Sequence, residues 1–77
     1  MITKKQFHTI QDIQQLQRLA TQSNDDVGLH SLDSSMIVDA KSYIGLYTLD
    51  FSQPVLVVSE DEKFHAAIAD IGETVND

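Results

Sequence analysis

The sequence predicts an α+β fold: an open-faced sandwich in which a four-stranded, mainly antiparallel sheet carries three helices on one face, in the order β-α-β-β-α-β-α. Two observations lead to this class. Segments with the two-residue alternation of strands are interleaved with segments whose apolar residues recur every three or four positions, as in helices. Residues 55–58 form an unbroken apolar run, which is typical of an interior strand. One sheet with helices on one side buries a single face of that sheet.

The N-terminal third predicts a strand followed by an amphipathic helix. Residues 2–7 alternate loosely and indicate the first strand. Thr9, with Asp12 three residues later, comes close to a capping box and predicts a helix that begins there and ends near Ser23. Glutamines and Arg18 occupy one side of this helix. The other side is apolar and comprises Ile10, Ile13, Leu16, Leu19 and Ala20.

A hairpin and a short helix are predicted next. Residues 27–32 and 36–38 read as strands joined by a turn at 33–35. Ser42 is the predicted N-cap of a helix over residues 43–49. The candidate core contacts of that helix are Ile44, Leu46, Tyr47 and Leu49.

The last helix is predicted directly after the 55–58 strand. Ser59 and Glu62 form a full capping box, and acidic residues in the first turn suit the helix dipole. Spacings of four, three and four residues place one apolar stripe along this helix, made of Phe64, Ile68, Ile71 and Val75.

Length and charge limit the classes of function. The 77 residues predict one domain over 1–77, and the absence of cysteine excludes disulfides and thiolate chemistry. A net charge of −7 argues against nucleic-acid binding, which needs a basic surface, and favours a basic partner. No apolar run is long enough for a membrane span or a signal peptide, so we expect a cytoplasmic protein.

Residues 39–49 carry a resemblance to a known family. Here Lys41-Ser42 is followed by two hydrophobic residues, Gly45 and another hydrophobic residue. This stretch resembles the start of the second helix in the histidine phosphocarrier protein (HPr) of the bacterial sugar phosphotransferase system. The aliphatic 55–58 run with the acidic start of the next helix also fits. The resemblance, strongest over 26–71, implies a single HPr-like domain with strand order 1-4-2-3 and no enzymatic activity of its own.

The same resemblance makes His8 a phosphoacceptor candidate. In the family, a histidine at the start of the first helix accepts a phosphoryl group that comes from phosphoenolpyruvate, and an arginine steadies the phosphate. His8 and Thr9 match two positions of that motif, whereas Ile10 and Gln11 stand at its arginine and proline positions. An imidazole beside free helix N–H groups could hold a phosphate. The alternative is an ordinary polar residue between strand and helix.

Ser42 is the second candidate. In gram-positive members of the family, the serine at this position is phosphorylated by a dedicated kinase that signals carbon status. The alternative, which does not exclude the first, is that Ser42 acts only as a helix cap. Beside it, Ile44, Leu46 and Tyr47 are partner-contact candidates, although their spacing on the helix favours the core.

These expectations favour a divergent or regulatory HPr-like protein of the sugar phosphotransferase system that acts through protein contact. Its expected partners are components of that system or a serine-directed kinase. A genuine phosphocarrier using His8 and a stand-alone interaction module remain the alternatives. We expect no cofactor and no metal, because His8, His30 and His65 lack metal-ligand spacing. His65 is expected at the surface, paired with the acidic residues before it.

Overall fold

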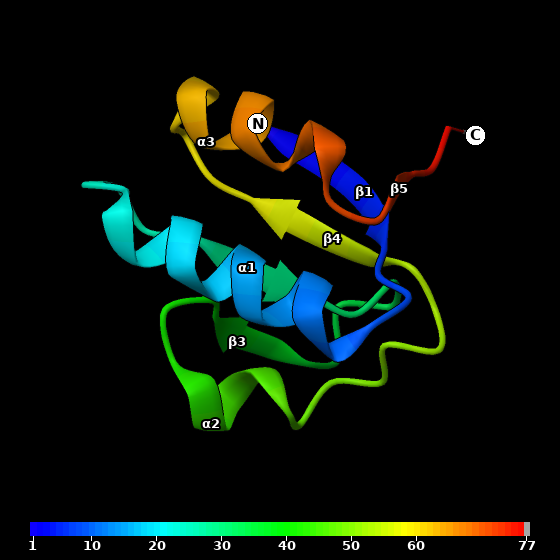
Figure 1. The fold of residues 1–77 in the computed structure, drawn as a ribbon. Helices are drawn as coiled ribbons and strands as arrows, with labels where there is room; N and C mark the ends of the chain where they lie inside the picture. The colour runs from blue at the N-terminus through cyan, green and yellow to red at the C-terminus, as the bar shows by residue number, and fades with distance from the viewer. Residues whose placement is uncertain (77) are drawn as a thin grey trace.

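A computed structural model describes residues 1–76 of the chain (Figure 1). Within that range the strands form one antiparallel sheet in the order β3-β2-β4-β1-β5. The elements, in chain order, are β1 (Ile2–Gln6), α1 (Ile10–Gln22), β2 (Gly28–His30), β3 (Ile37–Asp39), α2 (Tyr43–Leu46), β4 (Val55–Val58), α3 (Glu62–Ala67), the 3₁₀ helix η1 (Ile68–Asp70) and β5 (Glu73–Thr74). The α+β class and the order of the first four strands are as predicted. The sheet has five strands instead of four.

Strand β4 lies inside the sheet, as its apolar sequence predicted. It pairs with β1 on one side, where Val58 is opposite Ile2, and with β2 on the other, where Val58 is opposite Gly28. Val55 and Val57 are buried on one face, while Leu56 and Val58 are partly exposed on the other. The two faces of the sheet therefore differ in how well they are covered.

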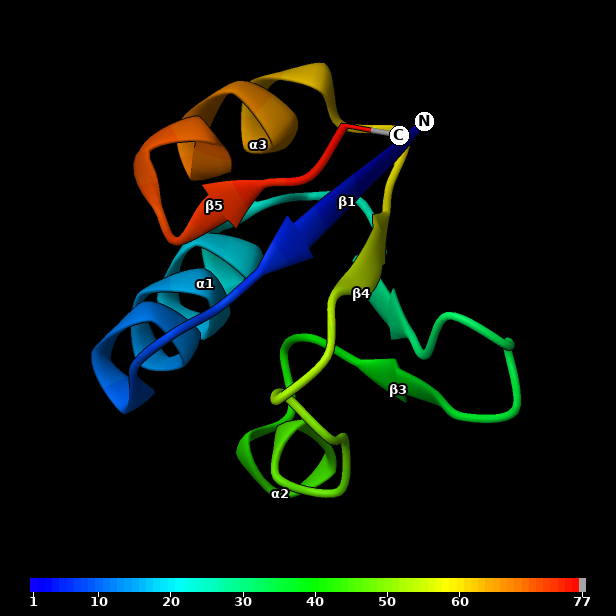
Figure 2. The ribbon, with the colours of Figure 1, turned by 90° about the vertical axis from the view of Figure 1, so that its right-hand side faces the viewer.

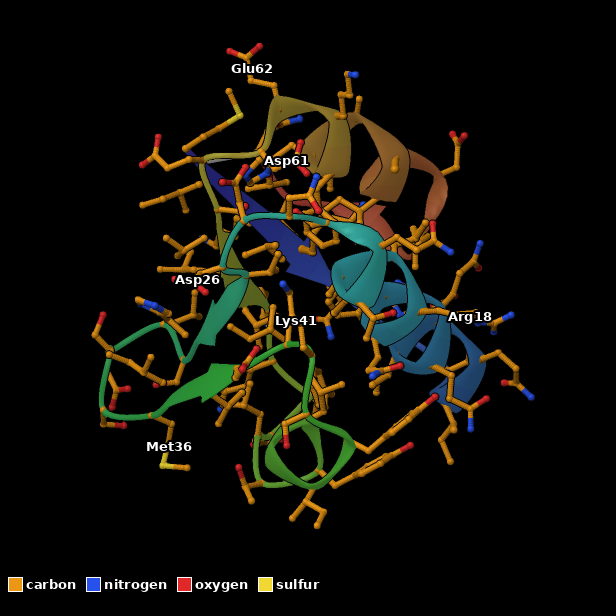
Figure 3. The ribbon with its side chains drawn as sticks, turned by 90° about the vertical axis from the view of Figure 1, so that its left-hand side faces the viewer. Arg18, Asp26, Met36, Lys41, Asp61 and Glu62 are labelled. Carbon is orange, nitrogen blue, oxygen red and sulfur yellow. The ribbon has the colours of Figure 1, made fainter. Side chains whose placement is uncertain are left out.

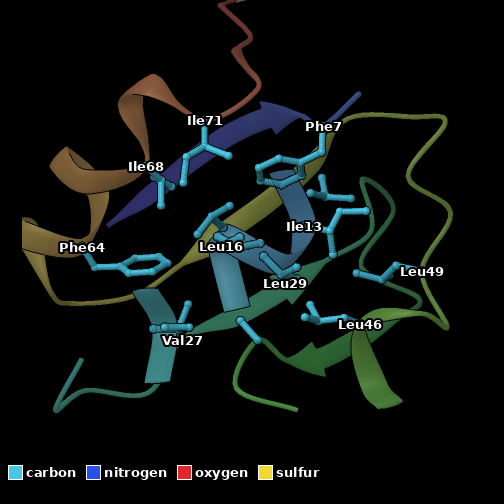
Figure 4. Packing of buried hydrophobic residues seen from close by; sticks show 14 residues of the cluster. Phe7, Ile13, Leu16, Val27, Leu29, Leu46, Leu49, Phe64, Ile68 and Ile71 are labelled. Carbon is cyan, nitrogen blue, oxygen red and sulfur yellow. The ribbon is translucent and has the colours of Figure 1, made fainter. Parts of the chain in front are cut away.

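The hydrophobic core lies on the face covered by the helices. Figure 2 shows α1 and α3 on the same side of the sheet, and Leu46 attaches α2 to the same core. Figure 4 shows side chains from helices and strands meeting in one cluster. The buried members are Phe7, Ile13, Leu16, Ala20, Val27, Leu29, Ala40, Leu46, Leu49, Val55, Val57, Phe64, Ile68 and Ile71.

Helix α1 begins as predicted. Thr9 is the N-cap, and its Oγ1 accepts a hydrogen bond of 3.1 Å from the backbone N–H of Asp12. The Asp12 carboxylate accepts from the N–H of His8 at 3.2 Å, one residue before the cap. Ile10, which was predicted on the apolar side, is instead exposed in the first turn.

The turn between β2 and β3 is closed by side chains. Asp33 Oδ1 accepts hydrogen bonds from the Ser35 backbone N–H at 3.0 Å, from the Ser35 hydroxyl at 2.7 Å and from the Ser31 hydroxyl at 2.8 Å. These bonds, led by the Ser35 N–H, lower the pKa of Asp33 to about 2, because they stabilise the charged carboxylate. The predicted turn at 33–35 therefore has a specific chemical cause.

Helix α2 is shorter than predicted and ends at Leu46 instead of residue 49. Ser42 is its N-cap, as predicted, with Oγ accepting from the Gly45 N–H at 3.2 Å. Beyond the helix, Leu49 N donates to Leu46 O at 3.4 Å, three residues back. Residues 47–49 therefore form a tighter turn, with a bond to the residue three positions back, where the sequence predicted a further turn of α-helix.

Helix α3 departs from the prediction at its start. Its N-cap is Asp61, whose Oδ1 accepts from the N–H groups of Lys63 and Phe64, and not Ser59. Ser59 Oγ accepts from the Asp61 N–H at 3.1 Å. The prediction of a capping box formed by Ser59 and Glu62 was therefore wrong, because the carboxylate of Asp61, two residues after Ser59, caps the helix.

The predicted stripe through Val75 was also wrong at its C-terminal end. The helix ends at Ala67, and η1 then leads to Gly72, whose φ of 60° turns the chain back toward β1. A Cβ at this glycine would lie 2.6 Å from the Gln6 carbonyl oxygen. Val75 N donates to Lys4 O at 2.9 Å, so this segment forms the fifth strand instead of continuing the helix.

Candidate functional site

His8 lies between β1 and α1, with an exposed side chain. Its Nε2 is 3.6 Å from Glu73 Oε2, and its backbone N–H donates to Asp12 Oδ2. We call His8, Asp12 and Glu73 the His8 corner. Strand β1 ends two residues earlier, so the imidazole precedes the N-terminus of α1 and does not lie on the sheet.

The electrostatics of the His8 corner do not favour a phosphate. The side chains that contact His8 in the His8 corner, Asp12 and Glu73, are both carboxylates. A phosphoryl group on the imidazole would bring further negative charge close to them. Ile10, which the predicted resemblance to HPr aligns with the arginine of the family motif, offers no charge. The Asp12 N–H at the helix N-terminus already donates to Thr9 Oγ1. The corner is therefore better suited to a neutral or cationic group than to an anion.

Lys5 lies close to this corner in sequence and was not identified from the sequence. It is fully buried on the core face of β1, and its Nζ donates to Thr74 Oγ1 at 3.0 Å. Burial lowers the pKa of Lys5 below its ordinary value of 10.5, and the charges of Asp12 and Asp70 oppose that change in part. The available signal was the alternation of β1, which places Lys5 on the same face as the core residue Phe7.

Ser42 is exposed at the start of α2, and three apolar side chains lie exposed beside it. We call Tyr43, Ile44 and Tyr47 the α2 patch. Ile44 is 84% exposed, the largest exposed fraction among the exposed large hydrophobic residues of the described chain. Two of the partner-contact candidates, Ile44 and Tyr47, are therefore at the surface, and their prediction as core contacts was wrong.

Leu46, the third partner-contact candidate, is not at the surface, and the alternative prediction of a core position is confirmed for it. It is fully buried and belongs to the hydrophobic core. Figure 4 shows its side chain directed into the same cluster as Leu49 and Ile13. Ile44 and Tyr47 are three positions apart and so lie on one side of the short helix, whereas Leu46 is two positions from Ile44 and adjacent to Tyr47 and points in another direction.

Polar contacts hold the start of α2 against α1. Gln17, buried on α1, donates from Nε2 to Lys41 O at 2.9 Å. Lys41 Nζ donates in turn to Ser23 O at 3.0 Å, at the C-cap of α1. Figure 3 shows Lys41 between α1 and α2. Because the last turn of α1 has no basic residue of its own, Lys41 supplies a positive charge at the negative end of that helix. Lys41, the residue before Ser42, is therefore fixed to α1 by two hydrogen bonds.

His65 was predicted at the surface, and this was wrong. Its ring is buried beneath the start of α3, where Nε2 lies 2.9 Å from Ser59 O and Nδ1 lies 2.7 Å from Thr3 Oγ1. A carbonyl oxygen can only accept, so Nε2 carries a proton and donates to it. In the tautomer whose proton is on Nε2, Nδ1 accepts from the Thr3 hydroxyl. His65 is a structural link between β1, β4 and α3.

Hollows on the surface of residues 1–76 include two that lie apart from His8 and Ser42. One, of about 670 Å³, lies between the C-terminal end of α1 and the start of α3, with Asp25, Asp61 and Glu62 among its lining residues. The second, of about 270 Å³, lies beside Gly28 on the uncovered face of the sheet. Within residues 1–76, no cluster of histidine and acidic side chains is arranged to hold a metal ion. In the same range, no helix has the length and apolar character needed to cross a membrane.

Comparison of the chain with protein-family models, with curated proteins and with solved structures gave no match. The resemblance to the HPr family therefore remains a prediction that depends on the Lys41-Ser42 segment and on the order of the elements.

Proposed function

We propose that this chain is an HPr-like protein of the phosphoenolpyruvate-dependent sugar phosphotransferase system, acting through protein contact as a divergent or regulatory member. It works in the cytoplasm without enzymatic activity of its own. The observation that carries this proposal is the α2 patch, where three large apolar side chains lie exposed within five residues. Single exposed apolar residues are common, but a group of them favours a partner surface.

The position of Ser42 supports a regulatory form of this contact. Its Oγ accepts the Gly45 N–H, so the hydroxyl proton is directed elsewhere and the exposed oxygen can carry a phosphoryl group. A phosphate there would place about two negative charges beside the α2 patch. An apolar partner surface that binds Ile44 and Tyr47 would then meet a strongly hydrated group. Modification of Ser42 would therefore switch the contact.

Treatment with the serine-directed kinase of the phosphotransferase system and ATP tests this proposal. The expected result is one acid-stable phosphate on the wild type that is absent from Ser42→Ala. Ser35→Ala, which removes an exposed serine in the turn between β2 and β3, is the matched control and keeps the phosphate. No incorporation, combined with no co-purification of any phosphotransferase component, would contradict the proposal and favour the stand-alone interaction module.

Phosphoryl transfer to His8 is the second candidate function, and the exposed position of His8 before the N-cap of α1 favours it. In this reaction a separate kinase first takes the phosphoryl group from phosphoenolpyruvate. The imidazole nitrogen of His8 then attacks the phosphorus, and the bond between phosphorus and that kinase breaks. Glu73 and Asp12 oppose the step by charge, so we rank it below regulation. An acid-labile phosphate, formed with phosphoenolpyruvate and the general kinase and lost in His8→Ala, would reverse this ranking.

A further inference from the structure

Figure 2 shows that no helix of the described chain covers the face of the sheet opposite α1 and α3. The strand register places apolar side chains on this face. Ile2 on β1 and Ile37 on β3 are 62% and 63% exposed. Leu56 and Val58 on β4 are half-buried between them. We call these four residues the open-face strip.

The strand register determines the length of the open-face strip. Ile2 is opposite Val58, and His30 on β2 lies between Leu56 and Ile37. From β1 to β3 there are three strand spacings, together about 14 Å. A helix of about ten residues has the same length. The strip therefore has the dimensions to hold one short amphipathic helix laid across the strands.

A hollow adjoins this strip because Gly28 has no side chain. It measures about 270 Å³ and is lined by Asp26, Gly28, His30, Val58, Ser59 and Glu60. Val58 provides an apolar wall, and the exposed carboxylates of Asp26 and Glu60 add negative charge to it. Figure 3 shows Asp26 on the opposite side of the molecule from Arg18 of α1. A lysine or arginine fits such a hollow, with its aliphatic stem against Val58 and its charge toward the carboxylates.

Charge decides which kind of partner suits this face. The open face of the sheet carries the exposed carboxylates of Asp26, Asp39 and Glu60. Lys4 is a basic residue of the same face. Glu60 also lies 4.0 Å from the amino group of Met1, in an exposed pair that contributes little. A second copy would bring the same carboxylates, on a chain of net charge −7, against this face. A basic partner has the complementary charge.

We infer that the open face of the sheet binds a basic amphipathic helix of a partner protein. Apolar side chains of that helix lie along the open-face strip, and one lysine or arginine enters the hollow beside Gly28. The inference uses neither Ser42 nor the α2 patch. It therefore stands or fails independently of the proposed role in the phosphotransferase system.

The test is a titration of the ¹⁵N-labelled full chain with a helical peptide of about 18 residues, which has leucines on one face and lysines on the other. A peptide of the same pattern with glutamate in place of lysine is the charge control. We expect saturable amide shifts in β1, β2, β3 and β4 with the lysine peptide only. Shifts centred on the α2 patch, or on the hollow between α1 and α3, would overturn the inference, as would equal binding of the glutamate peptide.

Two pairs of variants sharpen this test. A Cβ at Gly28 would come no closer than 3.4 Å to His30, so Gly28→Ala folds while narrowing the hollow, and we expect about five-fold weaker peptide binding. Gly45→Ala, whose Cβ would lie 3.5 Å from Ser42 Oγ, is the matched control on α2 and binds as the wild type does. Equal affinities of these two variants would contradict the model of insertion beside Gly28.

The charged pair is Asp26→Asn and Glu62→Gln. The first removes a carboxylate that lines the hollow and should weaken binding about three-fold, whereas Glu62 lies outside the hollow and its variant should bind normally. Circular dichroism checks that each variant is folded. If the free protein instead self-associates through the open face, seen as concentration-dependent shifts in β1 and β3, a second copy is the occupant and the inference is wrong.

Discussion

The α2 patch and the His8 corner are the two places where the resemblance put function, and they are built in opposite ways. At the α2 patch the polar groups serve the local fold, since Ser42 caps the helix, while apolar side chains are exposed. At the His8 corner the exposed groups are polar and contact one another, since Glu73 lies 3.6 Å from the imidazole and Asp12 accepts from the backbone N–H of His8. Exposed apolar surface remains available to a partner, whereas an imidazole flanked by carboxylates resists a phosphate. The comparison therefore favours contact over phosphoryl transfer.

The largest expected effect separates the buried from the exposed residues of α2. Leu46→Ala should lower the free energy of unfolding by about 3 kcal/mol, because it leaves a cavity in the core. Ile44→Ala, two residues earlier, should change it by less than about 0.5 kcal/mol. Urea denaturation of both variants measures the difference. Similar losses in the two variants would show that Ile44 also packs in the core and would remove the α2 patch.

The next effect concerns the attachment of β5 beside the His8 corner. Gly72→Ala should lower the free energy of unfolding by about 2 kcal/mol, because its φ is positive and its Cβ would approach the Gln6 carbonyl to 2.6 Å. Gly45→Ala in α2, where no such approach occurs, is the control and should be neutral or stabilising. Thermal unfolding followed by circular dichroism compares them. A wild-type melting temperature for Gly72→Ala would contradict this account of β5.

A pH dependence should follow from Lys5. Its pKa in the folded state is lowered below 10.5, so in the window between the lowered value and 10.5 the unfolded chain binds more protons than the folded chain. The free energy of unfolding should therefore rise with pH through that window. Lys5→Met should abolish this rise and leave stability at neutral pH equal or higher, since an apolar side chain fills the buried position.

Denaturation curves of both proteins at a series of pH values up to 10.5 measure the effect. The exposed tyrosines Tyr43 and Tyr47 are present in both proteins, so the difference between the curves isolates Lys5. Parallel stability profiles would mean that Lys5 is not buried as described.

The smallest expected effect tests the charge of the His8 corner. Glu73→Gln should change the free energy of unfolding by less than about 0.5 kcal/mol, because the pair with His8 is exposed. If carboxylate repulsion is what opposes phosphoryl transfer, the variant should accept more acid-labile phosphate than the wild type in the phosphoenolpyruvate assay. Glu62→Gln, which removes an exposed carboxylate of α3, is the matched control. Equal labelling of all three proteins would remove Glu73 from the explanation.

Local signals predicted much of the fold. The Thr9 and Ser42 caps each depend on an oxygen that reaches an N–H three residues later, so the neighbouring sequence was sufficient. The valine-rich 55–58 run identified the interior strand for a similar reason, because its composition does not depend on distant partners. The cap of α3 was missed where Ser59 and Asp61 competed within three residues, and local spacing could not rank them.

The site residues were harder to predict, because their roles depend on residues far away in the chain. The sequence grouped Ile44, Leu46 and Tyr47, and only the core around Leu46 separates that residue from the other two. The periodicity at His65 indicated a surface residue, but its ring is held by Thr3, 62 positions earlier. The alternation of β1 places Lys5 on the face of Phe7, but a lysine in a strand is usually exposed, so the burial of Lys5 was not predicted.

By itself the sequence determined the α+β class, the interior position of the 55–58 strand, and the starts of α1 and α2, because alternation, helical spacing and caps act within a few residues. Only the tertiary structure decided the fifth strand, the burial of Lys5 and His65, and the split between Leu46 and the α2 patch. Each of these depends on which distant segment lies alongside: β5 against β1, Thr3 against His65, and the core against α2. The contacts that bury a side chain are made across the sheet, and the side chain's own neighbours in the chain do not encode them.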